Sequence, residues 1–368
     1  MKFLIAPNAF KGTIPADDAA KLIATQLSNL AEVECLNQPL ADGGDGTCDL
    51  LIASLGLKKI SMLSLNAVGQ PIPGYFGWDS TQKKAFLDIS TASGIGILKP
   101  FQKDPFTSST FGTGLLIRSA IELGAEEIIL GLGGSATVDL GIGILNALGI
   151  LFLDESGREI PVFSPGYIRK IRHIQKSPTI PKVRFTLLCD VRNPFLGSSG
   201  AVSVFGPQKG LQLGQLDSYQ KDCEGLLGLL EKKSRKEWTD QEGFGAAGGI
   251  ALGLHFFFET EIKFGSSYFF DLVQMKEKVN WSDWVITGEG QYDSQSDAGK
   301  ASYELLQLAK ASQKKTALIT SGTGGRGSGF DLVLELPALD FSSFVFKEKA
   351  RENLLRLIQS AISEGKLS

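Results

Sequence analysis

Short apolar runs alternate with helical patterns at the start of the chain. Residues 2–7, KFLIAP, form a continuous apolar run of the kind found in a strand that is covered on both faces. Thr13 and the proline and aspartates that follow it predict a helix start, and apolar residues then recur at helical spacing over 20–30. A second strand is predicted at 33–40 and a second helix at 46–55. This order is typical of a parallel sheet with helices on its faces.

The pattern changes after about Leu65. Prolines and glycines punctuate two short strand-like runs, GYFGW and KAFLDIS, which predicts an antiparallel insertion. The strand-like run EIILGLG separates helical patterns at 114–123 and 138–148, and a further strand-like run, VRFTLLCDV, follows. Helices are also expected at about 216–236 and at 250–257. The middle of the chain therefore has a different architecture from its start.

Near the C-terminus the strand–helix alternation returns. The strand-like runs DWVITG, TALITSG and LVLEL are accompanied by predicted helices at 301–311 and 347–362. Because the two ends share one architecture, we predict an α/β protein of two α/β domains. Residues 1–65 and 283–368 would form one discontinuous domain, and 66–282 would form the inserted one. A cleft between the two domains is the expected place for a ligand.

Composition and charge narrow the possible functions. Of the 368 residues, 43% are hydrophobic and 21% are charged, as in ordinary soluble globular proteins. The net charge of -3 and the lack of a long basic run argue against a nucleic-acid partner or an anionic membrane surface. Polar residues and glycines interrupt the apolar stretch 128–153, so a strand–turn–helix–strand explains it better than a membrane span.

The four cysteines are scattered and form no CxxC pair. The apolar segment at the N-terminus is too short for a signal peptide. We therefore expect reduced thiols in a cytoplasmic protein. A zinc site is not expected because the sequence has no His/Cys cluster, and no GxSxG sequence supports a Ser–His–Asp hydrolase.

The sequence GLGGSATVDLG at 131–141 predicts an anion-binding turn between a strand and a helix. It contains the dinucleotide pattern GxGxxA, and Asp154 lies near the distance at which that pattern places an acidic partner. However, Ser135 and Thr137 add hydroxyl groups, and Asp139 would put negative charge at the helix start. Contact with an anion or phosphoryl group is favoured, with a dinucleotide site and a purely structural turn as alternatives.

Two other glycine-containing segments are less specific. The sequence GFGAAGG from Gly243 follows a charged segment, so it forms either a nest of backbone N–H groups or a close approach between helices. The sequence SQSDAGKAS lacks the first glycine of a Walker A motif and has Ala301 where the hydroxyl belongs. A P-loop is therefore not expected.

Acidic residues follow several predicted strand ends: Asp42, Asp45, Asp190, Glu289 and Asp293. The carboxyl ends of parallel strands meet in the crevice where α/β folds bind ligands. Carboxylates gathered there suit magnesium and a base that accepts a hydroxyl proton. A helix cap or a turn explains any single one of them equally well, but not all of them together.

Two lysines occupy compact, glycine-flanked loops. Lys11 follows the first strand in NAFKGT, and Lys209 ends VFGPQKG. Such charges suit a small carboxylate substrate or a polyphosphate. Phosphoryl transfer to a small molecule fits this set of groups best, because it requires positioning, magnesium and charge neutralisation but no special nucleophile.

Several segments together are more specific than any one of them. In order along the chain they are PNAFKGT, ADGGDGT, TSSTFGTGLLI, GGSATVD, CDVRNPFLG, VFGPQKG, GAAGG and ITGEGQYDSQSDAGK. With these motifs the chain resembles the bacterial glycerate kinase family nearly end to end. The resemblance implies a discontinuous Rossmann-like domain, an inserted flavodoxin-like domain and a site between them. It also implies ATP- and Mg²⁺-dependent phosphorylation of D-glycerate, commonly to the 2-phosphate.

The resemblance also implies functional positions by motif, and we assign a role to each of them from its chemistry. Asp190 would be the general base, and Lys11 and Lys209 would neutralise the substrate carboxylate and the transferring phosphoryl group. Residues implied to hold or orient magnesium are Asp42, Asp45 and Asp293. Residues implied to bind substrate or phosphate are Gly133, Gly134, Ser135, Thr137, Asp139, Asn193, Lys209 and Glu289.

The chain departs from the family pattern at a few positions. Asn8 stands where aspartate is usual, Val138 replaces an asparagine, and Asp45 is one methylene shorter than the usual glutamate. Gln291 and Tyr292 replace a common Arg–Ile or Arg–Leu pair. An active kinase that is a monomer or a homodimer is the favoured hypothesis. A non-catalytic or substrate-shifted relative and a nicotinamide-dependent dehydrogenase are the alternatives.

Overall fold

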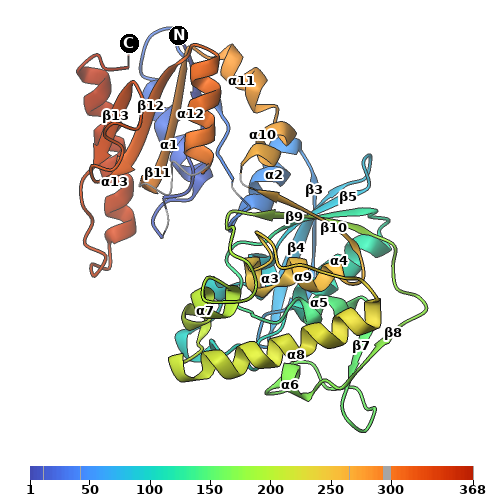
Figure 1. The fold of residues 1–368 in the computed structure, drawn as a ribbon. Coiled ribbons are helices and arrows are strands. Elements are labelled where there is room, and N and C mark those ends of the chain that lie inside the picture. Colours follow the sequence, from blue (N-terminus) through green and yellow to red (C-terminus); the bar gives the residue numbers. More distant parts are fainter. Residues whose placement is uncertain (11, 42, 265, 293–299, 368) are drawn as a thin grey trace. The chain divides into compact units, whose positions relative to one another are not determined.

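The structure is a computed structural model that describes residues 1–10, 12–41, 43–264, 266–292 and 300–367. The predicted site residues Lys11, Asp42 and Asp293 lie outside these ranges. The chain forms two compact units (Figure 1). Unit 1 comprises Met1–Asp42 and Gly265–Ser368, and unit 2 comprises Gly43–Phe264.

Unit 1 contains a five-stranded sheet in the order β13-β12-β11-β1-β2, in which every neighbouring pair is parallel. Its strands are β1 (Lys2–Ile5), β2 (Glu34–Asn37), β11 (Trp284–Gln291), β12 (Lys315–Ser321) and β13 (Leu332–Leu336). In chain order this is the doubly wound arrangement 2-1-3-4-5. The order reverses between β1 and β11, which makes their carboxyl ends the expected ligand-binding edge of this unit.

Helices cover the sheet of unit 1 (Figure 1). They are α1 (Ala16–Leu27), α10 (Ser267–Leu272), α11 (Met275–Trp281), α12 (Ala301–Ala311) and α13 (Phe346–Ser363). Helix α13 packs against α1, and α12 packs against β11 and β12. In α13 the buried Ala350, Leu354, Ile358 and Ala361 recur every three or four residues, so one face joins the core.

Unit 2 contains a six-stranded mixed sheet in the order β10-β9-β6-β5-β4-β3. Its strands are β3 (Lys58–Leu65), β4 (Pro71–Asp79), β5 (Lys84–Asp88), β6 (Glu127–Gly131), β9 (Arg184–Cys189) and β10 (Glu259–Phe264). Strands β5, β6, β9 and β10 are parallel to their neighbours within this group. The runs GYFGW and KAFLDIS fall in β4 and β5, which pair antiparallel as the sequence predicts.

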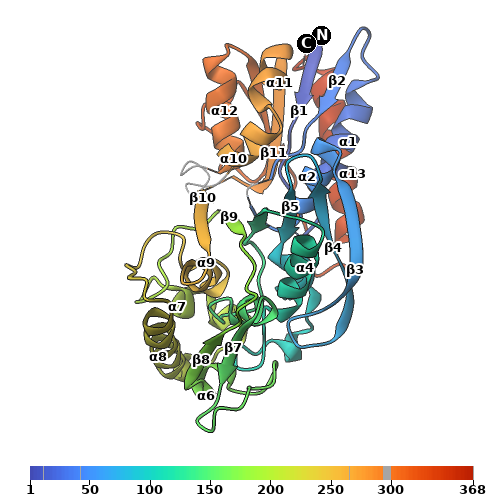
Figure 2. The same cartoon turned by 90° about the vertical axis from the view of Figure 1, so that its right-hand side faces the viewer.

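The helices of unit 2 pack on both this sheet and one another. They are α2 (Thr47–Leu55), α3 (Ile89–Ser93), α4 (Phe111–Glu122), α5 (Ile142–Ala147), α6 (Tyr167–Lys170), α7 (Ala201–Phe205), α8 (Leu216–Ser234) and α9 (Ile250–His255). Helix α2 packs on β4 and β5, and α4 packs on α5. The long helix α8 lies beside α6 and a small hairpin-like sheet of β7 (Ile150–Leu153) and β8 (His173–Lys176) (Figure 2).

The predicted α/β class is confirmed, but the units divide at other positions than the domains predicted from the sequence. The divisions fall at 42/43 and 264/265, where 65/66 and 282/283 are predicted. Segment 43–65 belongs to unit 2 because β3 pairs with β4 along its whole length and α2 packs on β4 and β5. The strand order 2-1-3-4-5, typical of flavodoxin-like sheets, belongs to the terminal unit, whereas the inserted unit has a mixed sheet.

The helix predicted at 138–148 begins only at Ile142. Leu140 and Gly141 both have a positive φ, of 52° and 67°, which is incompatible with a continuous right-handed helix. The glycine-rich turn is therefore longer than the pattern predicts. Among the described residues, no helix has both the length and the apolar character required to cross a bilayer.

Candidate active site

The carboxyl ends of three parallel strands meet at one edge of the unit 2 sheet. In the register, Asp88 of β5 is opposite Gly131 of β6, and Gly131 is opposite Leu188 of β9. The glycine-rich turn leaves the sheet after β6, and Asp190 follows β9. The fold therefore brings the turn and the predicted base to the edge where α/β sheets bind ligands.

The loop that carries Asp45 packs directly on this edge. The Gly133 amide donates a hydrogen bond of 3.1 Å to the carbonyl oxygen of Gly43. A Cβ on Gly133 would lie 2.4 Å from the Cα of Gly44, so only glycine allows the two turns to approach this closely. Gly134, at the tip of its turn, and Asp45 are both exposed and lie side by side. The Gly134 backbone and the Asp45 carboxylate are thus exposed next to each other.

A buried lysine lies beneath the same turn. The Lys209 ammonium donates hydrogen bonds of 2.7 Å to the Ser135 hydroxyl and 2.7 Å to the Thr137 carbonyl oxygen. Lys209 is 3% exposed, and both of its partners are buried. Burial lowers the pKa of Lys209 to about 7, although the negative charge of Asp139 acts to raise it. Lys209 can therefore exist in either charge state near neutral pH.

The hydroxyl groups of the turn do not face solvent. Thr137 is fully buried, and its Oγ1 has no hydrogen-bond partner within the described residues. The turn exposes Gly134 and part of Gly133 instead. In this structure the Ser135 hydroxyl and the Lys209 ammonium are bound to each other and support the turn from within.

Asp139 links the starts of two helices. Its Oδ2 accepts hydrogen bonds from the amide and the hydroxyl of Thr110, at 2.9 and 2.8 Å, and its Oδ1 accepts one of 3.2 Å from the Gly141 amide. The Thr110 hydroxyl also accepts a hydrogen bond from the Ile144 amide. Burial raises the pKa of Asp139, and these hydrogen bonds act in the opposite direction. The carboxylate therefore fixes α4 and α5 relative to the turn.

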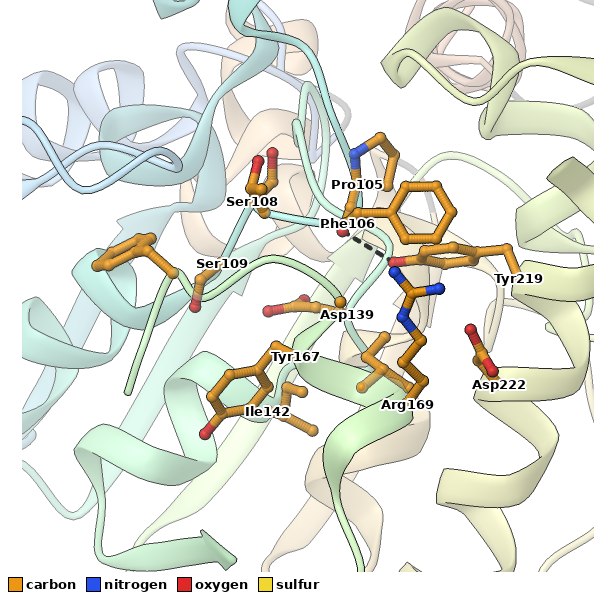
Figure 3. Close-up of a pocket in the computed structure, with 14 residues that line it drawn as sticks. Pro105, Phe106, Ser108, Ser109, Asp139, Ile142, Tyr167, Arg169, Tyr219 and Asp222 are labelled. Carbon is orange, nitrogen blue, oxygen red and sulfur yellow. Dashed lines mark hydrogen bonds between the residues drawn. The ribbon is translucent and has the colours of Figure 1, made fainter. Parts of the chain in front are cut away.

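A pocket in unit 2 has Asp139 in its lining (Figure 3). Beside Asp139, the Tyr219 hydroxyl donates a hydrogen bond of 3.0 Å to the Pro105 carbonyl oxygen. Phe106 packs edge-on against Tyr219 and carries the Arg169 guanidinium at 5.5 Å from its ring centre. Of the predicted site residues that the structure describes, Asp139 alone lines this pocket, so the pocket does not bring them together.

Asp190 and Asn193 lie in the loop that follows β9. Asp190 is exposed, and its charge adds to burial in raising the pKa of the neighbouring Cys189 to about 12. The Asn193 side chain donates a hydrogen bond of 2.7 Å to the Ser199 carbonyl oxygen, which closes the loop on itself. The Gly245 amide donates to the Asn193 carbonyl oxygen at 2.9 Å. The loop is thus held in shape while Asp190 stays accessible.

The second glycine cluster serves close packing. A Cβ on Gly245 would lie 2.3 Å from the Pro194 carbonyl oxygen, and one on Gly248 would lie 2.2 Å from the Thr137 carbonyl oxygen. The Leu140 amide donates to the Gly248 carbonyl oxygen at 3.0 Å. The structure shows close backbone approach at this segment, but to the loop after β9 and to the glycine-rich turn, whereas the sequence leaves open a nest or an approach between helices.

In unit 1, Asn8 and Glu289 lie at the carboxyl ends of the central strands β1 and β11. The Asn8 amide donates a hydrogen bond of 2.8 Å to the Gly288 carbonyl oxygen, which brings the two segments together. Glu289 is buried and lies next to a register shift between β11 and β12. This is the point where the strand order of the sheet reverses, the usual ligand-binding edge of such sheets.

Magnesium binds oxygen ligands, and of the three residues predicted to hold it, Asp45 lies within the described ranges, with its carboxylate exposed at the sheet edge of unit 2. Over the described ranges, no group of three or more His, Cys, Asp or Glu side chains is arranged to hold a metal ion. Asp42 and Asp293 lie outside those ranges. The donors present match the chemistry of Mg²⁺ without forming a complete set of ligands.

Sequence reasoning missed Asp88. This carboxyl group is 2% exposed at the end of β5, and burial raises its pKa well above the usual range. In the sequence it is one polar residue within the apolar run KAFLDIS. Its position at the end of a predicted parallel strand could have marked Asp88 as a site residue. Its hydrogen-bond partner, the Cys48 amide, could not be found in this way because it lies 40 residues away in the chain.

Comparison with known proteins is consistent with this arrangement. A model of the family described as "Glycerate kinase family" matches residues 3–360. Glycerate kinase of Haemophilus influenzae is 34% identical over 322 residues, which cover 87% of this chain and 85% of that protein. Glycerate 2-kinase of Escherichia coli is 32% identical over 318 residues, which cover 85% of this chain and 83% of that protein.

A solved structure is similar over the full length. It is a crystal structure from Salmonella typhimurium LT2, provisionally assigned as glycerate kinase 2. It has a TM-score of 0.84 and 29% sequence identity, and the alignment covers 100% of this chain and 98% of that chain. The family match and the structural match thus both span nearly the whole chain, and the chain belongs to the glycerate kinase family of enzymes.

Proposed function

We propose that this protein is a glycerate kinase that transfers the terminal phosphoryl group of ATP to a hydroxyl group of D-glycerate. The reaction requires Mg²⁺ and yields ADP and a phosphoglycerate, with the 2-phosphate as the expected isomer. The observation that carries the proposal is the match to the family along residues 3–360. The sheet edge of unit 2 supports it, because the glycine-rich turn and the exposed carboxylates of Asp45 and Asp190 all belong to loops at this edge. We place the enzyme in the cytoplasm.

Asp190 is the proposed general base. It is exposed at the end of β9, and a carboxylate in that position can accept the proton of the attacking hydroxyl as the O–P bond forms. Asn193, in the same loop, orients the substrate from a backbone that Ser199 and Gly245 hold in place. Lys11 is the proposed cation that neutralises the substrate carboxylate.

The turn after β6 is the proposed contact for the transferring phosphoryl group or for the carboxylate of glycerate. Its tip, Gly133 and Gly134, lets an anion approach the backbone closely. Lys209 places a titratable ammonium beneath that tip. An anion at the tip stabilises the protonated form of Lys209, so charge is supplied where the anion binds. Glu289 is the proposed substrate- or phosphate-binding residue of unit 1.

Asp42, Asp45 and Asp293 are the residues proposed to hold magnesium. When bound, Mg²⁺ neutralises charge on the phosphate oxygens of ATP. The protein holds Asp45 on a loop that packs closely against the turn, through contacts of Gly43 and Gly44 with Gly133. A carboxylate held in this way does not need to be ordered when the ion binds.

The test is to mix the purified protein with ATP, Mg²⁺ and D-glycerate, follow ADP release, and identify the product by NMR. We expect one phosphoglycerate isomer. An Asp190→Asn variant should lose about 100-fold or more in kcat if this residue is the base. No turnover with ATP still bound would favour the substrate-shifted or non-catalytic alternative, and Asn8→Asp would then show whether position 8 is the cause.

The dehydrogenase alternative has a separate test. Thermal shifts with NADH and with ATP–Mg²⁺ should differ, because a ligand raises Tm only if it binds the folded protein. We expect a shift with ATP–Mg²⁺ and none with NADH. The reverse result would contradict the proposed kinase activity.

A further inference from the structure

The buried carboxyl group of Asp88 has a role that the sequence motifs do not reveal. Asp88 directly precedes α3, but its side chain does not cap that helix. Its Oδ2 instead accepts a hydrogen bond of 2.7 Å from the amide of Cys48, in the first turn of α2. The Gly46 amide also stabilises the carboxylate. Asp88 thus caps a helix that begins 41 residues earlier in the chain.

Helix α2 needs an acceptor from elsewhere in the fold. The residue before it is Gly46, which has a φ of 88° and no side chain with which to cap the helix. The first amides of a helix have no partner within the helix and are costly to bury unsatisfied. Asp88 satisfies one of them and places a carboxyl group at the positive end of the helix dipole.

The loop fixed in this way is the one that carries Asp45. Glycine contacts hold its other side: a Cβ on Gly43 would lie 2.9 Å from the carbonyl carbon of Leu188, and one on Gly133 would lie 2.4 Å from the Cα of Gly44. Residues 43–48 are therefore held between β9, the turn after β6 and the Asp88 carboxyl group.

The second oxygen of Asp88 makes the residue unusual. Oδ1 is buried and has no hydrogen-bond partner within the described residues. It occupies the space left by the missing side chain of Gly131, where a Cβ would lie 2.5 Å away. A buried polar atom without a partner is costly, so its presence at this position requires an explanation.

We propose that Asp88 is a positioning residue for the reaction, which holds the 43–48 loop, and with it Asp45, against the Gly133–Gly134 tip. It acts through the Cys48 amide and not by touching substrate. Its effect on catalysis rests on the proposed kinase function, whereas its effect on the loop does not.

The first experiment measures the loop itself by hydrogen–deuterium exchange of peptides that cover residues 44–50. In Asp88→Ala, we expect exchange there to become about tenfold faster or more, because the anchor of the first helical turn is lost. Asp88→Asn retains an acceptor for the Cys48 amide, so its exchange should stay close to wild type. Unchanged exchange in Asp88→Ala would overturn the proposal.

The second experiment measures steady-state kinetics with ATP, Mg²⁺ and D-glycerate. Asp88→Ala should lower kcat/KM about tenfold or more and raise the Mg²⁺ concentration needed for half-maximal rate, whereas Asp88→Asn should stay within about threefold. Asp49→Asn is the matched control, because this exposed carboxylate of α2 accepts hydrogen bonds from the side chains of Lys59 and Tyr75, on the surface of the unit. It should behave as wild type.

Two outcomes separate the alternatives. If Asp88→Asn loses as much activity as Asp88→Ala while its loop exchange is unchanged, the carboxylate itself is needed at the reacting groups and positioning is wrong. If the wild type does not phosphorylate D-glycerate, the proposed function fails, and the exchange result alone decides the role of Asp88. Should Asp88→Ala not fold, Gly131→Ala displaces the same carboxyl group from the opposite side and should reproduce the faster exchange.

Discussion

At the residue scale, the titratable side chains of the unit 2 site fall into two groups. Buried ones hold the loops of the site in place, and exposed ones are accessible to a ligand. Asp88, Asp139 and Lys209 are each at most 3% exposed, whereas Asp45 and Asp190 are exposed. Buried charged groups require partners, and breaking such a set is strongly destabilising. Exposed carboxylates contribute little to stability and are accessible to a ligand. The two groups should therefore respond differently to substitution.

Asp139 and Asp45 make a matched pair for this contrast. Asp139→Ala should lower the free energy of unfolding by about 3 kcal/mol, because it leaves the Thr110 and Gly141 donors without an acceptor. Asp45→Ala should change it by about 0.5 kcal/mol or less, yet lower kinase activity. Urea denaturation and the ADP-release assay measure the two effects. Equal stability losses would show that burial does not separate these residues.

Lys209 should make stability depend on pH. Its pKa is about 7 in the folded protein against 10.5 for the ordinary side chain, so between these values the unfolded chain binds more protons. The stability contributed by the neutral lysine is then fully present above about pH 10.5 and is lost as the pH falls through about 7. Compared with Lys209→Met, the wild type should gain free energy of unfolding between about pH 7 and pH 10. A pH-independent difference in urea denaturation would contradict this.

At the element scale, backbone φ and the space around the Cα decide which glycines can be replaced by a larger residue. Gly249 has a φ of 92° and would meet Phe195 and Leu140 with any added Cβ, at 2.6 and 2.7 Å. Gly225 and Gly228 lie inside α8, where an added Cβ meets nothing within 4 Å. A helical glycine of this kind costs backbone entropy without any compensating contact.

Substitutions of these glycines should therefore have opposite signs. Gly225→Ala and Gly228→Ala should each raise the free energy of unfolding by about 0.5 to 1 kcal/mol. Gly249→Ala should lower it, because the new methyl group is both crowded and in a left-handed conformation. Denaturant midpoints of the three variants check the prediction. A loss of stability in both α8 variants would mean that these glycines have a further role.

Elements whose signals are local could be predicted from the sequence, and those fixed by distant partners could not. Helix α12 has the predicted bounds, 301–311, because its apolar positions recur at helical spacing. Strand β3 was not identified, since KKISMLSL keeps most of its residues partly exposed and becomes a strand only by pairing with β4. The late start of α5 depends on the positive φ of Leu140, which nothing in the local pattern requires.

The same limit applies to the candidate site. Motifs indicated which loops carry chemistry, and the strand ends of β6 and β9 do bring the glycine turn and Asp190 to one edge. The motifs could not show that Lys209 donates to the Ser135 hydroxyl and the Thr137 carbonyl oxygen, because these residues lie 72 to 74 positions from Lys209 in the chain. Asp88 was missed for the same reason: only the fold brings Cys48 to it.

At the scale of the whole molecule, each unit has its own hydrophobic core. The core of unit 2 includes the fully buried Ile128, Phe185 and Leu187, and that of unit 1 includes Phe3 and Ile286. Unit 2 is a continuous segment, Gly43–Phe264, whereas unit 1 requires both ends of the chain. A segment with its own core and closely placed ends of this kind is a candidate for independent folding.

The isolated segment 43–264 should therefore fold on its own. We expect it to show near-UV circular dichroism and a cooperative urea transition, because its sheet and core contain no strand from unit 1. Segment 1–42 with 265–368, expressed as one chain through a short linker, is the matched comparison. A 43–264 fragment without a cooperative transition would show that the core of unit 2 depends on the rest of the protein.

The division of unit 1 between the two ends of the chain also sets an order in time. On the ribosome, β1 and β2 emerge first, but β11, the other neighbour of β1 in the sheet, begins about 250 residues later and so follows after roughly 10 to 50 seconds. Unit 2 is complete before that strand appears. Phe3 and Ile5 are fully buried in the finished sheet, but during synthesis they have no β11 to pack against. We therefore expect chaperones to bind the nascent N-terminal segment until β11 has been synthesised.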